Sequence, residues 1–179
     1  MPLTEARMRE CVDDEELFKL LSDELQWRLP DGEGDDLDDF LRRLRALPLG
    51  LRAMAAMYQL DVSMALDDLG WHFANWHHRG YCEETLWALR ELEATEAAEI
   101  FEQAYALAQP YWDTIGERLD ASGDFDDFAE WYRGSDLETS LDPLNKQLWR
   151  LCKQKRSGLL SCWAPYALKY PYKVAQMAA

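Results

Sequence analysis

The sequence is poor in the residues that build sheets, and it has no long apolar run. Valine occurs only three times, and no alternating run of four or more β-branched residues is present. A sheet therefore has almost nothing to be built from. No stretch approaches the roughly 18 uninterrupted apolar residues of a membrane-spanning helix, and the N-terminus is charged. We expect an all-helical, cytoplasmic protein that does not bind a membrane.

Motifs for common catalytic chemistry are also absent. The sequence contains no Gly-rich phosphate loop, no nucleophile elbow and no paired-His metal helix, and its nine glycines stand singly. The cysteines are too far apart for a metal knuckle or a close redox pair, so we interpret them as reduced thiols in or near the core: Cys11, Cys82, Cys152 and Cys162. We expect no enzyme activity and no cofactor.

One group of residues has the chemistry of metal ligands, namely His72, His77, His78 and Cys82. His78 and Cys82 are four positions apart and would face one another on a continuous helix. Gly80 is expected to end that helix, which leaves residues 77–79 in its last turn, where cations offset exposed carbonyl groups. We favour this capping interpretation over a metal site. An enzyme built on this group is our third hypothesis for function.

Charge is both large and unevenly distributed. The formal net charge is −15, and residues 1–142 hold all 34 acids and 12 of the 19 bases, which gives −22. Residues 143–179 hold seven bases and no acid, which gives +7. An acidic body repels nucleic acid and attracts basic proteins. We therefore expect no direct nucleic-acid binding by the body; the alternative interpretation of the acids is that they serve solubility.

Hydrophobic periodicity predicts a single compact domain of about seven to nine helices. Asp13 and Glu16 have the spacing of a capping box before a helix that ends near Pro30. Asp36 is expected to cap the next helix. The compact acidic helical domain is expected to span residues 1–157.

The next part of the chain contains a glycine within a helical pattern. Pro48 suits the first turn of a third helix, and Asp61 is expected to start a fourth that continues through Gly70 and stops at Gly80. Glycine costs roughly 1 kcal/mol relative to alanine inside a helix. Gly70 therefore indicates a kink or the close approach of another backbone.

Later segments continue the helical period. Residues 82–92 and 95–108 predict a helical hairpin because their junction is short. A further helix is expected from Pro110, and the Asp142–Pro143 pair predicts the start of the last clear helix.

The C-terminal residues 158–179 are basic and aromatic, and we expect a partly irregular tail packed on the body. The bases here and just before are Lys146, Arg150, Lys153, Lys155, Arg156, Lys169 and Lys173. Such a mixture of cations and aromatic rings can bind nucleic acid by charge and stacking. We favour the alternative that it folds back, because a +7 segment is tethered to a −22 body.

Three glutamates on one predicted helix, Glu96, Glu99 and Glu102, recur at a spacing of three, so their carboxylates form a row about 5 to 6 Å apart. This spacing approximates that of phosphates along a nucleic-acid strand, although any Glu-rich helix displays such a row. Adding acids near other helix starts gives our candidate partner-binding residues: Asp35, Asp36, Asp38, Asp39, Glu96, Glu99, Glu102, Asp124, Asp126 and Asp127.

The segment 61–108 contains a helix with Gly70 and Phe73, an aromatic residue at Trp76, a short loop at Gly80, and then the 97–104 helix. In these features it resembles a family of small acidic bacterial helical domains known from a DNA mimic protein. We expect the family-like core to extend over about 49–156. The resemblance implies four fold determinants: Gly70, Phe73, Trp76 and Gly80.

Members of that family look all-helical, and most have no assigned function. The described member presents carboxylates in place of DNA phosphates to a regulatory protein, as a dimer. The resemblance therefore implies a basic DNA-binding or regulatory protein as partner, and a homodimer. Our leading hypothesis is an acidic protein-binding module that occupies a basic DNA-binding surface. The runner-up is an interaction or assembly subunit that uses exposed aromatic side chains such as Trp163, Tyr170 and Tyr172.

Overall fold

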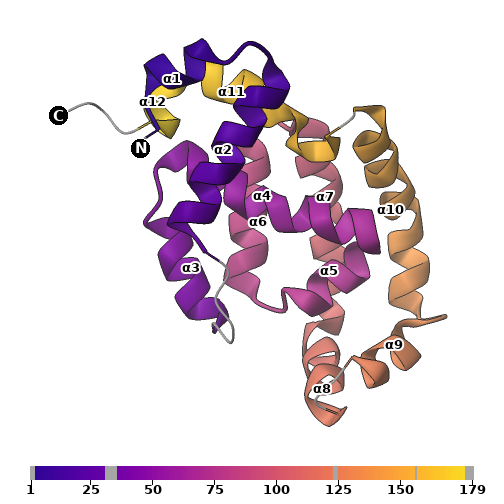
Figure 1. Cartoon of the computed structure of the whole chain (residues 1–179). Helices are drawn as coiled ribbons and strands as arrows, with labels where there is room; N and C mark the ends of the chain where they lie inside the picture. The colour runs from indigo at the N-terminus through magenta and orange to yellow at the C-terminus, as the bar shows by residue number, and fades with distance from the viewer. Residues whose placement is uncertain (1–2, 31–35, 123–124, 156, 176–179) are drawn as a thin grey trace.

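The structure is a computed structural model that describes residues 3–30, 36–122, 125–155 and 157–175, without the side chains of 120–122. Within these ranges all regular secondary structure is helical, which confirms the expected all-helical single domain (Figure 1). The elements are α1 Glu5–Glu10, α2 Asp14–Arg28, α3 Leu37–Arg45, α4 Leu49–Leu66, α5 Leu69–Asn75, α6 Arg79–Glu91, α7 Thr95–Ala108, η1 Gln109–Tyr111, α8 Trp112–Ser122, α9 Asp126–Tyr132, α10 Asp136–Gln154, η2 Gly158–Cys162, α11 Trp163–Lys169 and α12 Pro171–Val174.

Helix α4 forms the centre of the core. It is apolar around most of its circumference, and its residues Leu51, Met54, Met57 and Leu60 have no exposed surface. A helix with this pattern is stable only when neighbours cover it on several sides. Here α4 packs on α6, and α7 lies between α6 and α10 (Figure 1).

The predicted helix starts near the N-terminus are confirmed. The side chain of Asp13 accepts a hydrogen bond from the backbone N–H of Glu16 at 2.9 Å, and the Glu16 carboxylate accepts one from Val12 N–H at 2.7 Å. Asp36 caps α3 by accepting from Asp38 N–H at 2.9 Å. These side chains pair N–H groups that have no partner within the helix.

The helices around residue 70 have different boundaries from those expected. No helix starts at Asp61, because α4 runs unbroken from residue 49 to residue 66. The chain breaks after α4, and Asp68 caps α5 by accepting from Trp71 N–H at 3.0 Å. Gly80 does not end a helix either; it lies in the first turn of α6, which His78 caps.

Pro143 lies inside α10 and does not start it. Ser135 caps this helix by accepting from Glu138 N–H at 3.1 Å. Leu137 and Leu141, which precede the proline, have no exposed surface. Their burial favours a helix upstream of Pro143, although a proline removes one helical hydrogen bond.

Gly70 allows the close approach of a side chain, whereas the sequence indicated a kink or another backbone at this position. A Cβ at this position would lie 2.2 Å from the ring of Tyr132. The hydroxyl of Tyr132 donates to the Asp68 carboxylate at 3.1 Å. The ring therefore closes over the start of α5, and any side chain at position 70 would displace it.

The C-terminal segment is more regular than expected, because η2, α11 and α12 occupy most of residues 158–174. Trp163 is only 1% exposed, and its ring lies 5.3 Å from that of Phe18 in α2. Trp163 is therefore part of the core, and the idea that it belongs to an exposed aromatic surface is wrong. Tyr172 is 63% exposed.

Candidate partner-binding surface

The four residues with ligand chemistry do not meet. His72 is fully buried, its Nδ1 lies 3.0 Å from the Ser63 hydroxyl, and burial lowers its pKa to about 3. Cys82 is also buried, which raises the pKa of its thiol. Among the described residues, no three His, Cys, Asp or Glu side chains are arranged to hold a metal ion.

His77 and His78 have structural partners that differ from the expected C-terminal capping role. The His77 ring stacks on Trp112 with centroids 4.4 Å apart, and its Nε2 lies 2.9 Å from the Trp112 carbonyl. His78 Nδ1 accepts from Tyr81 N–H at 3.2 Å, which caps the N-terminus of α6. The proton of a neutral His78 is therefore on Nε2, which lies 3.1 Å from Asp38.

The glutamate row on α7 is exposed, but neighbouring arginines partly neutralise it. Arg150 of α10 lies 3.9 Å from Glu96, and Arg90 of α6 lies 2.8 Å from Glu102. Glu99 is exposed and has no ion pair among the described residues. Three carboxylates and two guanidinium groups leave a net charge of only −1 at this row.

The acids at the start of α3 interact mainly with groups of the same helix. Asp36 caps the helix, and Asp39 forms an ion pair with Arg43 at 3.2 Å and another with Arg42. Asp38 is 80% exposed and lies beside His78. Asp35 falls outside the described residues.

Helices α8 and α9 lie in a strongly acidic part of the sequence. Residues 112–132, which include both helices, hold seven acids and one base. Asp126 and Asp127 lie in the first turn of α9, which packs on α8; Asp124 falls outside the described residues. We define the acidic α8–α9 end as these two aspartates together with Asp113, Glu117 and Glu130.

Sequence reasoning by capping and periodicity missed three of these five residues, although the local charge of residues 112–132 could have found them. Asp113 has a side chain 96% exposed, and its ion-pair partner Arg79 is 4.0 Å away. Glu117 and Glu130 are also exposed. Figure 1 shows α8 and α9 at the end of the molecule farthest from α1 and α12.

The candidate acids within the described residues therefore lie on three elements, α3, α7 and α8–α9, of which α7 continues through η1 into α8 (Figure 1). Of the three sets, the one on α3 is paired within its own helix and with His78, and the one on α7 is flanked by arginines. The acidic α8–α9 end has the highest local negative charge.

The basic C-terminal segment is held by glutamates at the end of α6. Lys169 Nζ lies 2.7 Å from Glu93, and Tyr170 donates to the same carboxylate at 2.7 Å. Lys173 and Tyr166 both donate to Glu91. Burial alone would raise the pKa of Glu91, but these two hydrogen bonds outweigh it and lower the pKa.

A family model described as DMP19-like protein matches residues 45–164, about two-thirds of the chain. The chain belongs to the DMP19-like protein family. Membership implies a DNA-mimic protein that binds DNA-binding proteins, in a family that is generally non-catalytic. No curated protein and no solved structure showed a significant match. Among the described residues, no helix has the length and apolar character needed to span a bilayer.

Proposed function

We propose that the chain is an acidic protein-binding module that occupies the basic DNA-binding surface of a regulatory or nucleoid protein. Its carboxylates replace DNA phosphates, and the contact is made by the acidic α8–α9 end. No cofactor takes part.

The observation that supports this proposal most directly is the separation of charge within the fold. Lys169 of α11 and Lys173 of α12 pair with Glu93 and Glu91. Figure 1 shows α12 at the end of the molecule opposite α8 and α9. The acids of residues 112–132 outnumber the bases by seven to one. These two lysines therefore do not neutralise the acidic α8–α9 end. Its negative electrostatic potential attracts basic proteins and raises their encounter rate.

The geometry favours a surface role over a structural one for these acids. Asp113, Glu117 and Glu130 are exposed. Helical positions three or four apart lie about 5–6 Å from one another, close to the spacing of successive phosphates along one strand. Asp113 and Glu117, four apart on α8, have this relation.

The experiment is affinity capture from a bacterial lysate at about 0.1 M salt, followed by elution along two separate routes. One column is washed stepwise to about 1 M salt, over which the Debye length falls from about 10 to 3 Å. The other is washed with duplex DNA at constant salt. A DNA mimic predicts that the same basic DNA-binding proteins elute early in salt and are displaced by DNA, because both ligands compete for one surface.

Partners that survive the high-salt wash and ignore duplex DNA would contradict the proposal. They would support the alternative in which the acids serve solubility and an apolar surface makes the contact. Trp27 and Tyr172, which are 74% and 63% exposed, are the aromatic side chains to replace in that case.

A further inference from the structure

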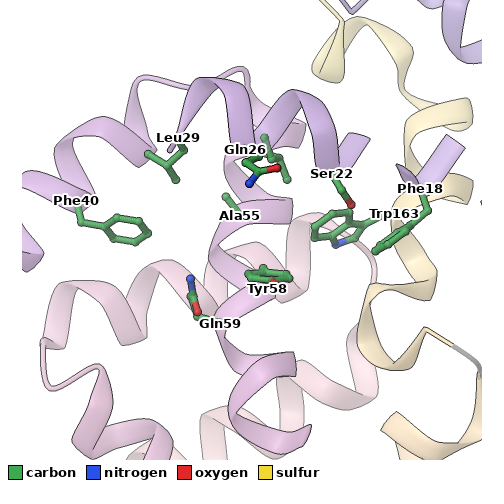
Figure 2. A pocket seen from close by; sticks show the side chains of 10 residues that line it. Phe18, Ser22, Gln26, Leu29, Phe40, Ala55, Tyr58, Gln59 and Trp163 are labelled. Carbon is green, nitrogen blue, oxygen red and sulfur yellow. The ribbon is translucent and has the colours of Figure 1, made fainter. Parts of the chain in front are cut away.

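A pocket lies between α2, α3, α4 and α11, on residues that the proposed function does not use. Its volume is about 470 Å³, within the range of pockets that bind small molecules. Figure 2 shows Phe18 and Trp163 at one end and Phe40 and Leu29 at the other. The complete lining is Phe18, Ser22, Leu25, Gln26, Leu29, Phe40, Ala55, Tyr58, Gln59 and Trp163.

The lining contains no charged side chain. This is informative, because 30% of the residues in the chain are charged. Burying a charge in such a pocket would leave it without a counterion, at a high desolvation cost. The occupant must therefore be uncharged and largely apolar.

The pocket also has polar groups with no internal partner. Gln26 is exposed and Ser22 and Gln59 are half-buried, and none of the three side chains makes a hydrogen bond to another described residue. Figure 2 shows the three distributed around the pocket. A few polar groups placed in an apolar lining are typical of sites that orient a ligand.

Trp163 supplies a second, independent observation. Its side chain is 1% exposed, and its indole N–H has no hydrogen-bond partner in the described part of the chain. An unpaired buried donor costs about 1–3 kcal/mol, so an acceptor is expected nearby. The rings of Trp163 and Tyr58 are 6.4 Å apart and tilted by 48°, so they are not stacked against each other. Figure 2 shows the indole at the end of the pocket between Phe18 and Tyr58.

We propose that this pocket binds a small uncharged aromatic or aliphatic molecule whose carbonyl oxygen accepts a hydrogen bond from the Trp163 indole. The molecule lies between the rings of Tyr58 and Phe40 and contacts Leu29 and Ala55. Gln26 and Gln59 provide further hydrogen bonds at the rim. This site is separate from the acidic α8–α9 end.

The first measurement is fluorescence titration of the full chain with three naphthalene dyes. Prodan is an uncharged ketone. N-phenylnaphthylamine is also uncharged but has no carbonyl group. Anilinonaphthalene sulfonate has the same skeleton as N-phenylnaphthylamine and carries a negative charge. Prodan is expected to bind at one saturable site. The sulfonate is expected to bind at least about tenfold more weakly than its uncharged counterpart, because the lining offers no cation.

Two filling variants locate the site. Ala55→Met places a longer side chain in the pocket, and Gln59→Trp narrows it from the half-buried rim; each should weaken prodan binding at least about tenfold. The matched control is Ala106→Met, at an exposed position of α7. Circular dichroism and melting temperature establish that each variant is folded.

Trp163→Phe tests the hydrogen bond, because it keeps an aromatic ring and removes the N–H. Prodan affinity should fall about five- to tenfold and N-phenylnaphthylamine affinity should change less than threefold, as expected for one lost hydrogen bond to a carbonyl. If Trp163 has a purely structural role, Trp163→Phe should lower the affinity for both dyes by the same factor.

The proposal is overturned if neither uncharged dye binds saturably, or if Ala55→Met and Gln59→Trp bind prodan as the unmodified chain does. It is also overturned if the two variants alter the oligomeric state in size-exclusion chromatography, because the pocket would then be a contact with a second copy of the chain.

Discussion

The C-terminal segment and the acidic α8–α9 end both combine aromatic and charged side chains, yet they use them differently. In the C-terminal segment, Trp163 is buried and the lysines pair with Glu91 and Glu93. On α8 and α9, Phe128 and Tyr132 are buried, while Asp113, Glu117 and Glu130 face solvent with few cations around them. In the first region the charges attach the C-terminal segment to the body, and in the second their exposure supports our proposal that they contact a partner.

The largest effect is expected from Trp163→Ala. Removing this buried ring should lower the free energy of unfolding by about 3–5 kcal/mol. The control is Tyr172→Ala, at an exposed residue of the same segment, which should cost no more than about 0.5 kcal/mol. Urea unfolding followed by circular dichroism measures both. If Trp163→Ala lowers the free energy of unfolding as little as Tyr172→Ala does, the segment is not part of the core.

The next effect concerns partner affinity. The triple variant D113N/E117Q/E130Q should weaken binding of a basic DNA-binding partner by about 10- to 100-fold at low salt, and should reduce the salt dependence. The control E10Q/D14N/D23N removes the same charge from exposed positions of α1 and α2. Titration calorimetry at several salt concentrations measures the difference. If the control weakens binding as much, net charge alone determines affinity.

Glu91→Gln tests the contacts that hold the C-terminal segment. Because the folded-state pKa of Glu91 is lowered, its contribution to stability is present above the ordinary carboxylate pKa and is lost as pH falls through the lowered value. We expect the variant to be about 1 kcal/mol less stable at neutral pH, and this difference to be smaller near pH 3, where more of the carboxylate is protonated.

The comparison variant for Glu91 is Glu83→Gln, at an exposed position of the same helix. It should leave stability within about 0.5 kcal/mol at both pH values. Urea unfolding at the two pH values is the measurement. A constant difference between Glu91→Gln and the unmodified chain across this range would contradict the assigned role of the carboxylate.

The smallest effect is expected on α7. The triple variant E96Q/E99Q/E102Q removes three charges, as the α8–α9 variant does, but Arg90 and Arg150 already offset two of them. Partner affinity should change less than about threefold, since exposed ion pairs contribute about 0–1 kcal/mol. A tenfold loss of partner affinity would indicate that the partner binds the glutamate row and not the acidic α8–α9 end.

Local signals in the sequence predicted much of the fold. The caps at Asp13 and Asp36 and the hairpin between α6 and α7 depend on contacts within a few residues, and they are confirmed. The wrong boundaries arose where tertiary packing overrides local preference. Pro143 is tolerated within α10, where its neighbours Leu137 and Leu141 are buried.

The sequence by itself determined that the chain is helical and that its charge is segregated, because helical periodicity and segment charge are properties of neighbouring positions. Only the tertiary structure decided which acids are neutralised. Arg150 and Glu96 lie on different helices, and Lys169 is 76 positions from Glu93. Such pairs depend on how helices pack, and packing also buried Trp163 beside a pocket that no local pattern indicates.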